Sequence, residues 1–225
     1  MVEPVITVTR YGHDRAPVVV IDNFFTDPSL LVDDAAMVAF GDGGLYYPGI
    51  RAAVHPAMSR RFVDAVTDVL AENFGLIPVD HECHYSLVTT PPDQLSPAQC
   101  LPHIDSVDPT RIALLHFLSS GDAGGTAFYR HRSTGFEMVT GERHAAYQKA
   151  LATDILHHGL PTPGYIAGDT PMFEELVVHK GRFNRALLYQ GNTLHCARIP
   201  ADMTYSPRPD RGRLTVNSFI QCKAV

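Results

Sequence analysis

The sequence lacks a long hydrophobic run and an excess of basic residues, and each absence excludes a class of protein. No apolar stretch approaches the roughly 20 residues that a bilayer-crossing helix needs. The start, Met1-Val2-Glu3-Pro4, has neither the basic residues nor the apolar core of a secretion signal. The 18 Lys and Arg are outnumbered by 24 Asp and Glu, which gives a formal net charge of -6. We therefore expect no membrane partner and no nucleic-acid partner.

Cysteine is scarce, and several catalytic motifs are missing. The four cysteines form no Cys-x-x-Cys pair, which argues against a zinc ribbon or a disulfide framework and favours a cytoplasmic location. The sequence contains no Gly-x-x-x-x-Gly-Lys-[Ser/Thr] phosphate loop and no Gly-x-Ser-x-Gly nucleophile elbow. The sequence therefore does not indicate a P-loop nucleotide hydrolase or a serine hydrolase.

The length and the hydrophobic content of the chain fit one domain. The 225 residues are 45% hydrophobic, which is enough apolar mass for a single core. We expect one domain over 1–225, in which residues 1–78 form a helical buttress and residues 79–225 form a jelly-roll core. An insertion at about 135–172 is expected to interrupt that core.

The periodic segments are mainly β after residue 78. Helical spacing of apolar residues predicts helices over about 26–40, 59–74 and 141–158. Short strands, separated by turn-rich pieces such as 121–125, predict a mainly β fold with flanking helices, a double-stranded β-helix or cupin-like jelly roll. The expected strands are 5–9, 18–22, 82–90, 112–119, 126–131, 176–179, 185–190 and 214–221.

The sharpest local feature is His103-Ile104-Asp105. In an extended segment, residues i and i+2 project to the same side, so the His103 imidazole and the Asp105 carboxylate can reach one point. A nitrogen and oxygen pair of this kind suits ferrous iron. Since the chain has 12 His, one His-x-Asp is expected by chance, and the tripeptide gains weight only from motifs later in the chain.

His195 completes the predicted metal site. It follows a buried-strand pattern and the turn Gly191-Asn192, and it opens the next extended piece. A jelly roll brings its second and seventh core strands side by side, which would carry His195 to the earlier pair. Two imidazoles and one carboxylate on one face of iron leave the opposite positions open for substrates. The predicted catalytic and metal-binding residues are His103, Asp105 and His195.

Arg213 is the third element of the pattern. It begins the last apolar strand, and Thr215 lies on the same face two residues later. Arginine matches a carboxylate with two parallel hydrogen bonds, and a threonine hydroxyl can add a third. Arg208 and Arg211 open no apolar strand, so Arg213 is the preferred carboxylate anchor.

In this order the motifs resemble those of the 2-oxoglutarate- and Fe(II)-dependent oxygenases. The likeness is to the prolyl-4-hydroxylase-like branch and to an uncharacterised bacterial group within the superfamily, and it covers about residues 80–222. It implies Fe(II), 2-oxoglutarate and O2 as cofactors and co-substrates. The implied reaction converts 2-oxoglutarate to succinate and CO2 and hydroxylates a C–H bond. The matching segments are 103–105, 111–118, 124–128, the strand leading to His195, and Arg213.

The resemblance also implies roles for two tyrosines. Tyr85 matches a tyrosine that donates its hydroxyl to the co-substrate, although a core position explains it equally well. Tyr129 is expected to face the pocket and contact the substrate, with a core position again as an equal alternative. The insertion at 135–172 is predicted to cover the mouth of the active site as a lid that selects the substrate.

The sequence thus predicts a 2-oxoglutarate-dependent dioxygenase, a hydroxylase of a small-molecule or peptide substrate, amino-acid-derived or within a protein. Two alternatives stay open: a cupin-like non-haem iron dioxygenase that uses no 2-oxoglutarate, and a non-catalytic binding module on the same fold. The identity of the substrate and the oligomeric state, a homodimer included, also stay open. The dense segment His81-Glu82-Cys83-His84 has no matching second half and is not predicted to bind zinc.

Overall fold

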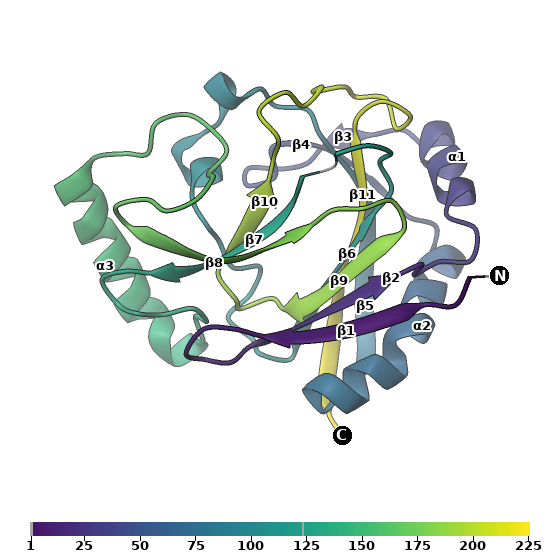
Figure 1. Ribbon diagram of the computed structural model, residues 1–225, viewed down its shortest axis with the longest axis horizontal. Helices are drawn as coiled ribbons and strands as arrows, with labels where there is room; N and C mark the ends of the chain where they lie inside the picture. Colours follow the sequence, from purple (N-terminus) through teal and green to yellow (C-terminus); the bar gives the residue numbers. More distant parts are fainter. Residues whose placement is uncertain (1, 123) are drawn as a thin grey trace.

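The computed structural model describes residues 2–122 and 124–225; Met1 and Ala123, the latter part of the turn-rich piece predicted at 121–125, lie outside the described residues. Two antiparallel sheets form the centre of the described chain (Figure 1). The smaller sheet contains β7 (Gly125–His131), β8 (Phe173–Lys180) and β10 (His195–Arg198). The larger sheet contains β1 (Val5–Arg10), β2 (Pro17–Asp22), β3 (Gly41–Asp42), β4 (Gly49–Ala53), β5 (Leu76–Val88), β6 (Arg111–Phe117), β9 (Arg185–Gln190) and β11 (Arg213–Ala224).

The strand order is that of a jelly roll. The larger sheet runs β1-β2-β9-β6-β11-β5-β4-β3 and the smaller runs β10-β7-β8, so strands distant in sequence pair throughout. The prediction of a mainly β, double-stranded β-helix fold is confirmed. Helices α1 (Ser29–Met37) and α2 (Pro56–Phe74) lie beside the larger sheet, and α3 (Gly141–His158) lies at the opposite side of the molecule (Figure 1).

Three apolar clusters hold these layers together. The first lies between the larger sheet and helices α1 and α2, the second between the two sheets, and the third between the smaller sheet and α3. Successive side chains of β11 point to opposite faces of the larger sheet. Leu214 and Val216 pack toward the helices, whereas Arg213, Thr215 and Asn217 point toward the smaller sheet. The space between the sheets is therefore where polar side chains of β11 can meet a ligand.

The N-terminal residues contribute more than the expected helical buttress. Strands β1 and β2 extend the larger sheet beyond β9, while β3 and β4 extend it beyond β5. Helix α2 begins three residues before the predicted start, since the His55 Nδ1 accepts a hydrogen bond from the Ala57 amide at 3.2 Å. It ends at Gly75, whose φ of 67° is the left-handed conformation that favours glycine.

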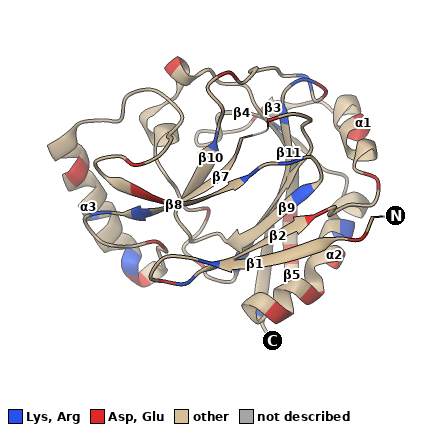
Figure 2. Ribbon diagram, viewed as in Figure 1, with Lys and Arg blue, Asp and Glu red and all other residues tan. Residues whose placement is uncertain are grey.

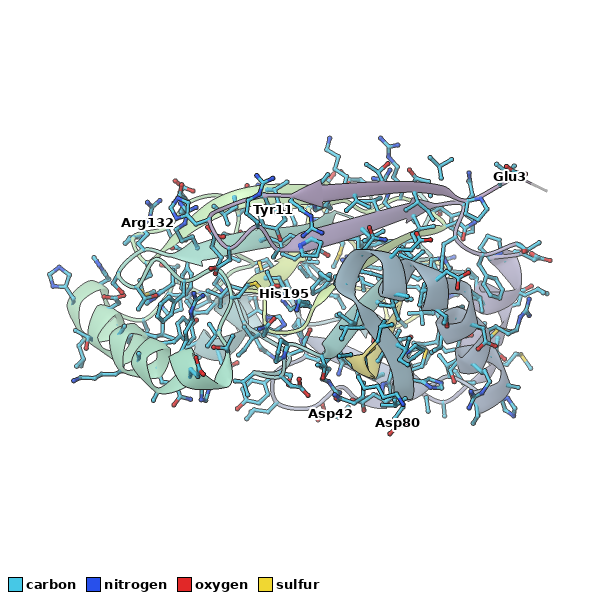
Figure 3. All side chains as sticks on the ribbon, turned by 90° about the horizontal axis from the view of Figure 1, so that it is seen from below. Glu3, Tyr11, Asp42, Asp80, Arg132 and His195 are labelled. Carbon is cyan, nitrogen blue, oxygen red and sulfur yellow. The ribbon has the colours of Figure 1, made fainter. Side chains whose placement is uncertain are left out.

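Charged side chains of both signs are spread along the helices and loops (Figure 2). Asp42, Asp80 and Arg132 lie near the periphery, whereas His195 lies between the layers (Figure 3). Among the described residues, no helix combines the length and the apolar character that crossing a bilayer requires. His195 is thus one of the polar groups that are buried between the sheets, apart from the charged residues at the periphery.

Candidate metal centre

Backbone pairing brings His103 and His195 together. The two residues form an antiparallel bridge in which each amide donates to the other's carbonyl, both at 2.9 Å. The Asp105 amide donates to the Gly191 carbonyl at 2.7 Å, which fixes the carboxylate beside the same pair. Residues 103–105 thus lie along the edge of the smaller sheet, next to β10. The contact between segments about ninety residues apart is created by main-chain hydrogen bonds and leaves the side chains available.

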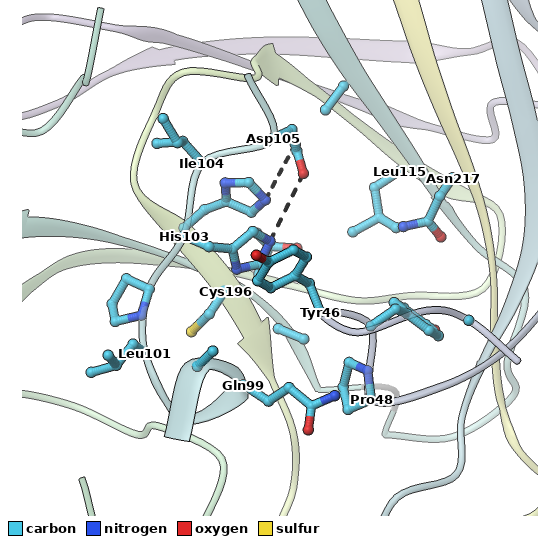
Figure 4. A pocket seen from close by; sticks show the side chains of 18 of the residues that line it. Tyr46, Pro48, Gln99, Leu101, His103, Ile104, Asp105, Leu115, Cys196 and Asn217 are labelled. Carbon is cyan, nitrogen blue, oxygen red and sulfur yellow. Dashed lines mark ion pairs between the residues drawn. The ribbon is translucent and has the colours of Figure 1, made fainter. Parts of the chain in front are cut away.

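The three side chains converge on one point. A nitrogen or oxygen atom from each of His103, Asp105 and His195 lies within 4.8 Å of the others. The Asp105 oxygens lie 3.8 Å from His103 Nε2 and 3.6 Å from His195 Nε2, distances too long for hydrogen bonds (Figure 4). Asp105 Oδ2 is buried and has no hydrogen-bond partner. Electron-rich atoms that converge without a shared proton are the arrangement that a bound cation satisfies.

The protonation state of His195 suits a metal ligand. Its Nδ1 lies 2.9 Å from the Thr193 carbonyl oxygen, so the ring donates from Nδ1 and directs the lone pair of Nε2 toward Asp105. Burial lowers the pKa of His195 to about 4, so the imidazole is neutral at neutral pH. Burial also raises the pKa of Asp105, while His103 and Arg51 oppose that rise. The carboxylate is therefore held where a positive charge would stabilise it.

A cavity of about 630 Å³ connects this centre to Arg213. Arg213 is only 4% exposed and donates to the Gly125 carbonyl at 3.2 Å, and its guanidinium lies 5.4 Å from the centre of the Phe117 ring. Burial lowers the pKa of Arg213, and the nearby hydroxyls of Tyr47, Tyr165 and Tyr189 counter that effect. The cavity thus has a metal-type donor set at one place and a buried cation at another.

Buried polar atoms around the cavity lack partners. Tyr47 Oη and Ser86 Oγ approach each other, yet neither makes a hydrogen bond of standard geometry. Thr126 Oγ1 and Arg51 Nε are also buried without a partner. Unsatisfied groups of this kind are uncommon in folded proteins and mark places where a ligand or water completes the hydrogen bonding. The position of the Tyr47, Ser86 and Thr126 hydroxyls near Arg213 fits a ligand that carries a carboxylate.

A family of unknown function, DUF6445, matches residues 2–220. The chain belongs to this family. No curated protein matches the DUF6445 chain.

Solved structures with the same fold include 2-oxoglutarate-dependent oxygenases. The epimerase SnoN from nogalamycin biosynthesis, described as non-haem and α-ketoglutarate-dependent, has a TM-score of 0.50 and 12% identity over 92% of the DUF6445 chain and 78% of its own. A Pseudomonas putida prolyl-4-hydroxylase has a TM-score of 0.45 and 14% identity over 91% of each chain. HygX from Streptomyces hygroscopicus, solved with nickel and 2-oxoglutarate bound, has a TM-score of 0.49 and 14% identity over 92% of the DUF6445 chain and 84% of its own. The likeness to SnoN confirms the predicted resemblance at the level of the fold.

Two tyrosines singled out in the sequence do not line the cavity of the DUF6445 protein. Tyr85 pairs with Val216 and faces α1, where its hydroxyl donates to Asp34 at 2.8 Å. Tyr129 is fully buried on the α3 side of the smaller sheet and donates to Glu175 at 3.1 Å. For both tyrosines the alternative of a core position holds, because the face of a strand that meets the cavity cannot be read from one sequence.

Thr215 lies beside the cavity and not on its wall. Its hydroxyl donates to Asn217 Oδ1 at 2.7 Å, and Asn217 does line the cavity. The direct bond from Thr215 to a co-substrate stays a prediction. The sequence reasoning selected the face of β11 that points toward the smaller sheet and did not anticipate Asn217, which lines the cavity.

Several cavity residues were not anticipated, and they come from the connecting segments. Tyr46 and Tyr47 lie in the loop before β4, and Arg51 lies in β4 itself, a strand of five residues whose Gly and Ala give little strand signal in the sequence. The predicted insertion also reaches the cavity, through α3 and residues 165–166. Its role as a lid that selects the substrate stays a prediction. The wall residues from that insertion are His144, Tyr147, Gln148, Leu151, Tyr165 and Ile166.

Proposed function

We propose that this protein is an Fe(II)- and 2-oxoglutarate-dependent dioxygenase that hydroxylates a C–H bond of its substrate. The observation that carries the proposal is the convergence of the His103, Asp105 and His195 side chains on one point with no side-chain hydrogen bond among them. Two imidazoles and one carboxylate form a facial donor set for ferrous iron, and the cavity leaves its other side open.

The residues present fit both groups that this function requires. His103, Asp105 and His195 would hold the iron, and Arg213 would hold the distal carboxylate of 2-oxoglutarate. The unpartnered hydroxyls of Tyr47 and Ser86 offer donors near that carboxylate. When bound, iron and 2-oxoglutarate supply the oxidising power for C–H hydroxylation, and succinate and CO2 are the coproducts.

The chain's own contribution is orientation and the exclusion of water. The hydrogen bond from His195 Nδ1 to the Thr193 carbonyl keeps Nε2 available as a ligand atom. The apolar cluster between the sheets, which includes Leu115, Phe117 and Tyr189, shields the inner end of the cavity from solvent. A buried Arg213 pairs more strongly with a carboxylate than an exposed one would, since water competes less for either group.

An anaerobic titration tests the proposal. The Fe(II)-loaded protein is titrated with 2-oxoglutarate, and the chelate is expected to give a weak visible charge-transfer band. Arg213→Ala should weaken 2-oxoglutarate binding at least tenfold and leave iron binding intact, while His195→Ala should weaken iron binding itself. Arg60→Gln, an exposed change on α2 with the same loss of charge, serves as the control.

The same titration separates the alternatives. An iron dioxygenase that uses no 2-oxoglutarate would bind iron without forming the band. A non-catalytic module would form the complex yet release no succinate in air. The proposal does not survive if wild-type protein saturated with Fe(II) neither forms the band nor converts 2-oxoglutarate to succinate.

A further inference from the structure

A second arginine lines the cavity and has no assigned partner. Arg51 lies in β4, opposite Ser86 of β5, and Ser86 in turn lies opposite Thr215 of β11. Arg51, Ser86 and Thr215 therefore share one row on the face that points between the sheets. With neighbouring strands about 5 Å apart, Arg51 lies about 10 Å from Thr215 across the sheet. This distance separates the backbone of Arg51 from β11, the strand that carries Arg213, with Ser86 of β5 between them.

The Arg51 guanidinium is held in place by an aromatic ring and not by an ion pair. It lies 4.1 Å from the centre of the Tyr47 ring, a cation–π contact that fixes its position. Among the described residues, no carboxylate pairs with it, and its buried Nε has no hydrogen-bond acceptor. By contrast, Arg130 and Arg185 each form an ion pair with a carboxylate. An ordered pocket arginine with unused donors is an anion-binding element.

The charges of the loaded site leave Arg51 unmatched. Among the described residues that line the cavity, and apart from histidines, the charged side chains are Asp105, Arg51 and Arg213. The positive charges of a ferrous ion and Arg213 are matched by Asp105 and by the two carboxylates of 2-oxoglutarate. The charge of Arg51 then stands alone in a cavity with low-dielectric walls, where an unpaired charge is unfavourable.

Position also separates Arg51 from the co-substrate anchor. Arg213 is buried at 4% exposure, whereas Arg51 is half-buried and lies in the strand that comes after the exposed loop residues Leu45 and Tyr46. Both loop residues line the same cavity, and Figure 4 shows Tyr46 among the residues around His103 and Asp105. Arg51 therefore lies on a more exposed part of the cavity wall than Arg213 does.

We propose that Arg51 binds a carboxylate of the primary substrate, so that the substrate is a small organic acid. This inference rests on the proposed function, because the charge argument counts iron and 2-oxoglutarate. The cavity volume of about 630 Å³ falls in the range of roughly 300–1,000 Å³ typical of small-molecule sites. It can hold 2-oxoglutarate together with one further molecule of modest size. The carboxylate can belong to a free acid or to the C-terminus of a short peptide.

The test measures binding of matched acids and amides to the anaerobic Fe(II)·2-oxoglutarate complex. The probes are hexanoate, phenylacetate, N-acetyl-L-phenylalanine and the tripeptide acetyl-Ala-Ala-Phe, each compared with its carboxamide. Binding is followed as a change in the visible charge-transfer band and, independently, by calorimetry. We expect at least one acid to bind ten times more tightly than its amide. Preference for the tripeptide acid over the small acids would identify a peptide terminus as the source.

Variants decide whether Arg51 is responsible. Arg51→Gln should remove the preference for the acid and leave 2-oxoglutarate binding within threefold of wild type, which also shows that the variant folds. Arg51→Lys should retain part of the preference, and Arg60→Gln should retain all of it. Equal binding of acids and amides by wild type, or an undiminished preference in Arg51→Gln, overturns the inference. A tenfold loss of 2-oxoglutarate binding in Arg51→Gln overturns it as well, whereas absence of the band in wild type refutes the proposed function instead.

Discussion

At the scale of single residues, Asp105 shows that a side chain placed to bind a metal ion destabilises the metal-free protein. Its carboxylate is largely buried, with 13% of the side chain exposed, and its Oδ2 accepts no hydrogen bond. The nearest ring nitrogen, His195 Nε2, presents a lone pair and not a proton. Without a cation, these groups repel each other in a setting where water cannot fully separate them.

Asp105→Asn should therefore stabilise the metal-free protein and impair metal binding. The amide removes a buried charge, and its N–H can donate to His195 Nε2. We expect a gain of about 1 kcal/mol in the free energy of unfolding, measured by urea denaturation in the presence of a chelator. Addition of Ni²⁺ should raise the Tm of wild type and leave that of the variant nearly unchanged.

The control is Asp68→Asn, which removes an exposed carboxylate on α2. It should change neither the stability of the metal-free protein nor the Tm shift with Ni²⁺. If Asp105→Asn lowers the stability of the metal-free protein, or keeps the full response to Ni²⁺, Asp105 is an ordinary structural residue and not a ligand.

Sequence reasoning could place residues whose arrangement depends on local geometry, and it could not place residues whose arrangement depends on strand register. His103 and Asp105 are two apart in an extended segment, so their shared face results from local geometry alone. Tyr85 required knowledge of which β5 residues face the cavity. The pairing of Arg213 with Val88 and of Thr215 with Ser86 puts the even-numbered residues there, and a shift of one residue would have reversed the answer.

At the scale of elements, the segment that delivers His195 is held by a buried carboxylate. Residues 137–139 pair with 192–194, and the Leu194 amide donates to the Glu137 carbonyl at 2.8 Å. The Glu137 side chain is 1% exposed and accepts hydrogen bonds from the His13 and Asp14 amides at 2.9 and 3.0 Å. Arg130 completes the cluster through Nε at 2.9 Å. The turn between β1 and β2 is thereby fastened to the segment next to the metal centre.

Glu137→Gln should weaken both the fold and the metal site. The amide keeps one acceptor and turns N–H groups toward donors, so the cluster loses its charge balance. A cost of about 3 kcal/mol in the free energy of unfolding is expected, as for breaking one partner of a buried ion pair. Urea denaturation measures this change, and calorimetry with Ni²⁺ should show weaker binding because the 192–194 segment is less well held.

Glu72→Gln, an exposed change on α2, is the matched control and should stay within about 0.5 kcal/mol of wild type. If Glu137→Gln loses stability but binds Ni²⁺ with unchanged affinity, the hydrogen-bonded cluster around Glu137 does not influence the metal centre. Sequence alone gave no access to this arrangement, since Glu137 contacts residues more than a hundred positions away. The strong strand patterns of β6, β9 and β11 were predictable, whereas short β4 and its Arg51 were not.

At the scale of the whole molecule, neutral histidines packed inside the structure predict sensitivity to acid. His116 is the clearest case: it is fully buried, its ring lies edge-on to Phe24 at 5.0 Å, and its Nε2 donates to Asn184 Oδ1 at 3.0 Å. Burial lowers the pKa of His116 to about 4, and the Asn184 contact opposes that shift only in part. Burial also lowers the pKa of His131 and of His179.

The sign of the effect is set by proton binding in the two states. Because the pKa of His116 is about 4 in the folded protein and about 6.5 when unfolded, the unfolded state binds more protons between these values. Its contribution to stability is therefore complete above about pH 6.5 and is lost as the pH falls to about 4. The shift corresponds to about 3 kcal/mol for this residue alone.

His116→Gln isolates that contribution. Glutamine can still donate to Asn184 but does not titrate, so its free energy of unfolding should fall about 3 kcal/mol less than that of wild type between pH 6.5 and 4. Urea denaturation at intervals of half a pH unit, with a chelator present to keep metal out, measures both curves. His158→Gln, an exposed change at the end of α3, should reproduce the wild-type curve. Parallel curves for wild type and His116→Gln would mean that His116 accepts a proton in the folded protein as readily as in the unfolded chain, contrary to its burial.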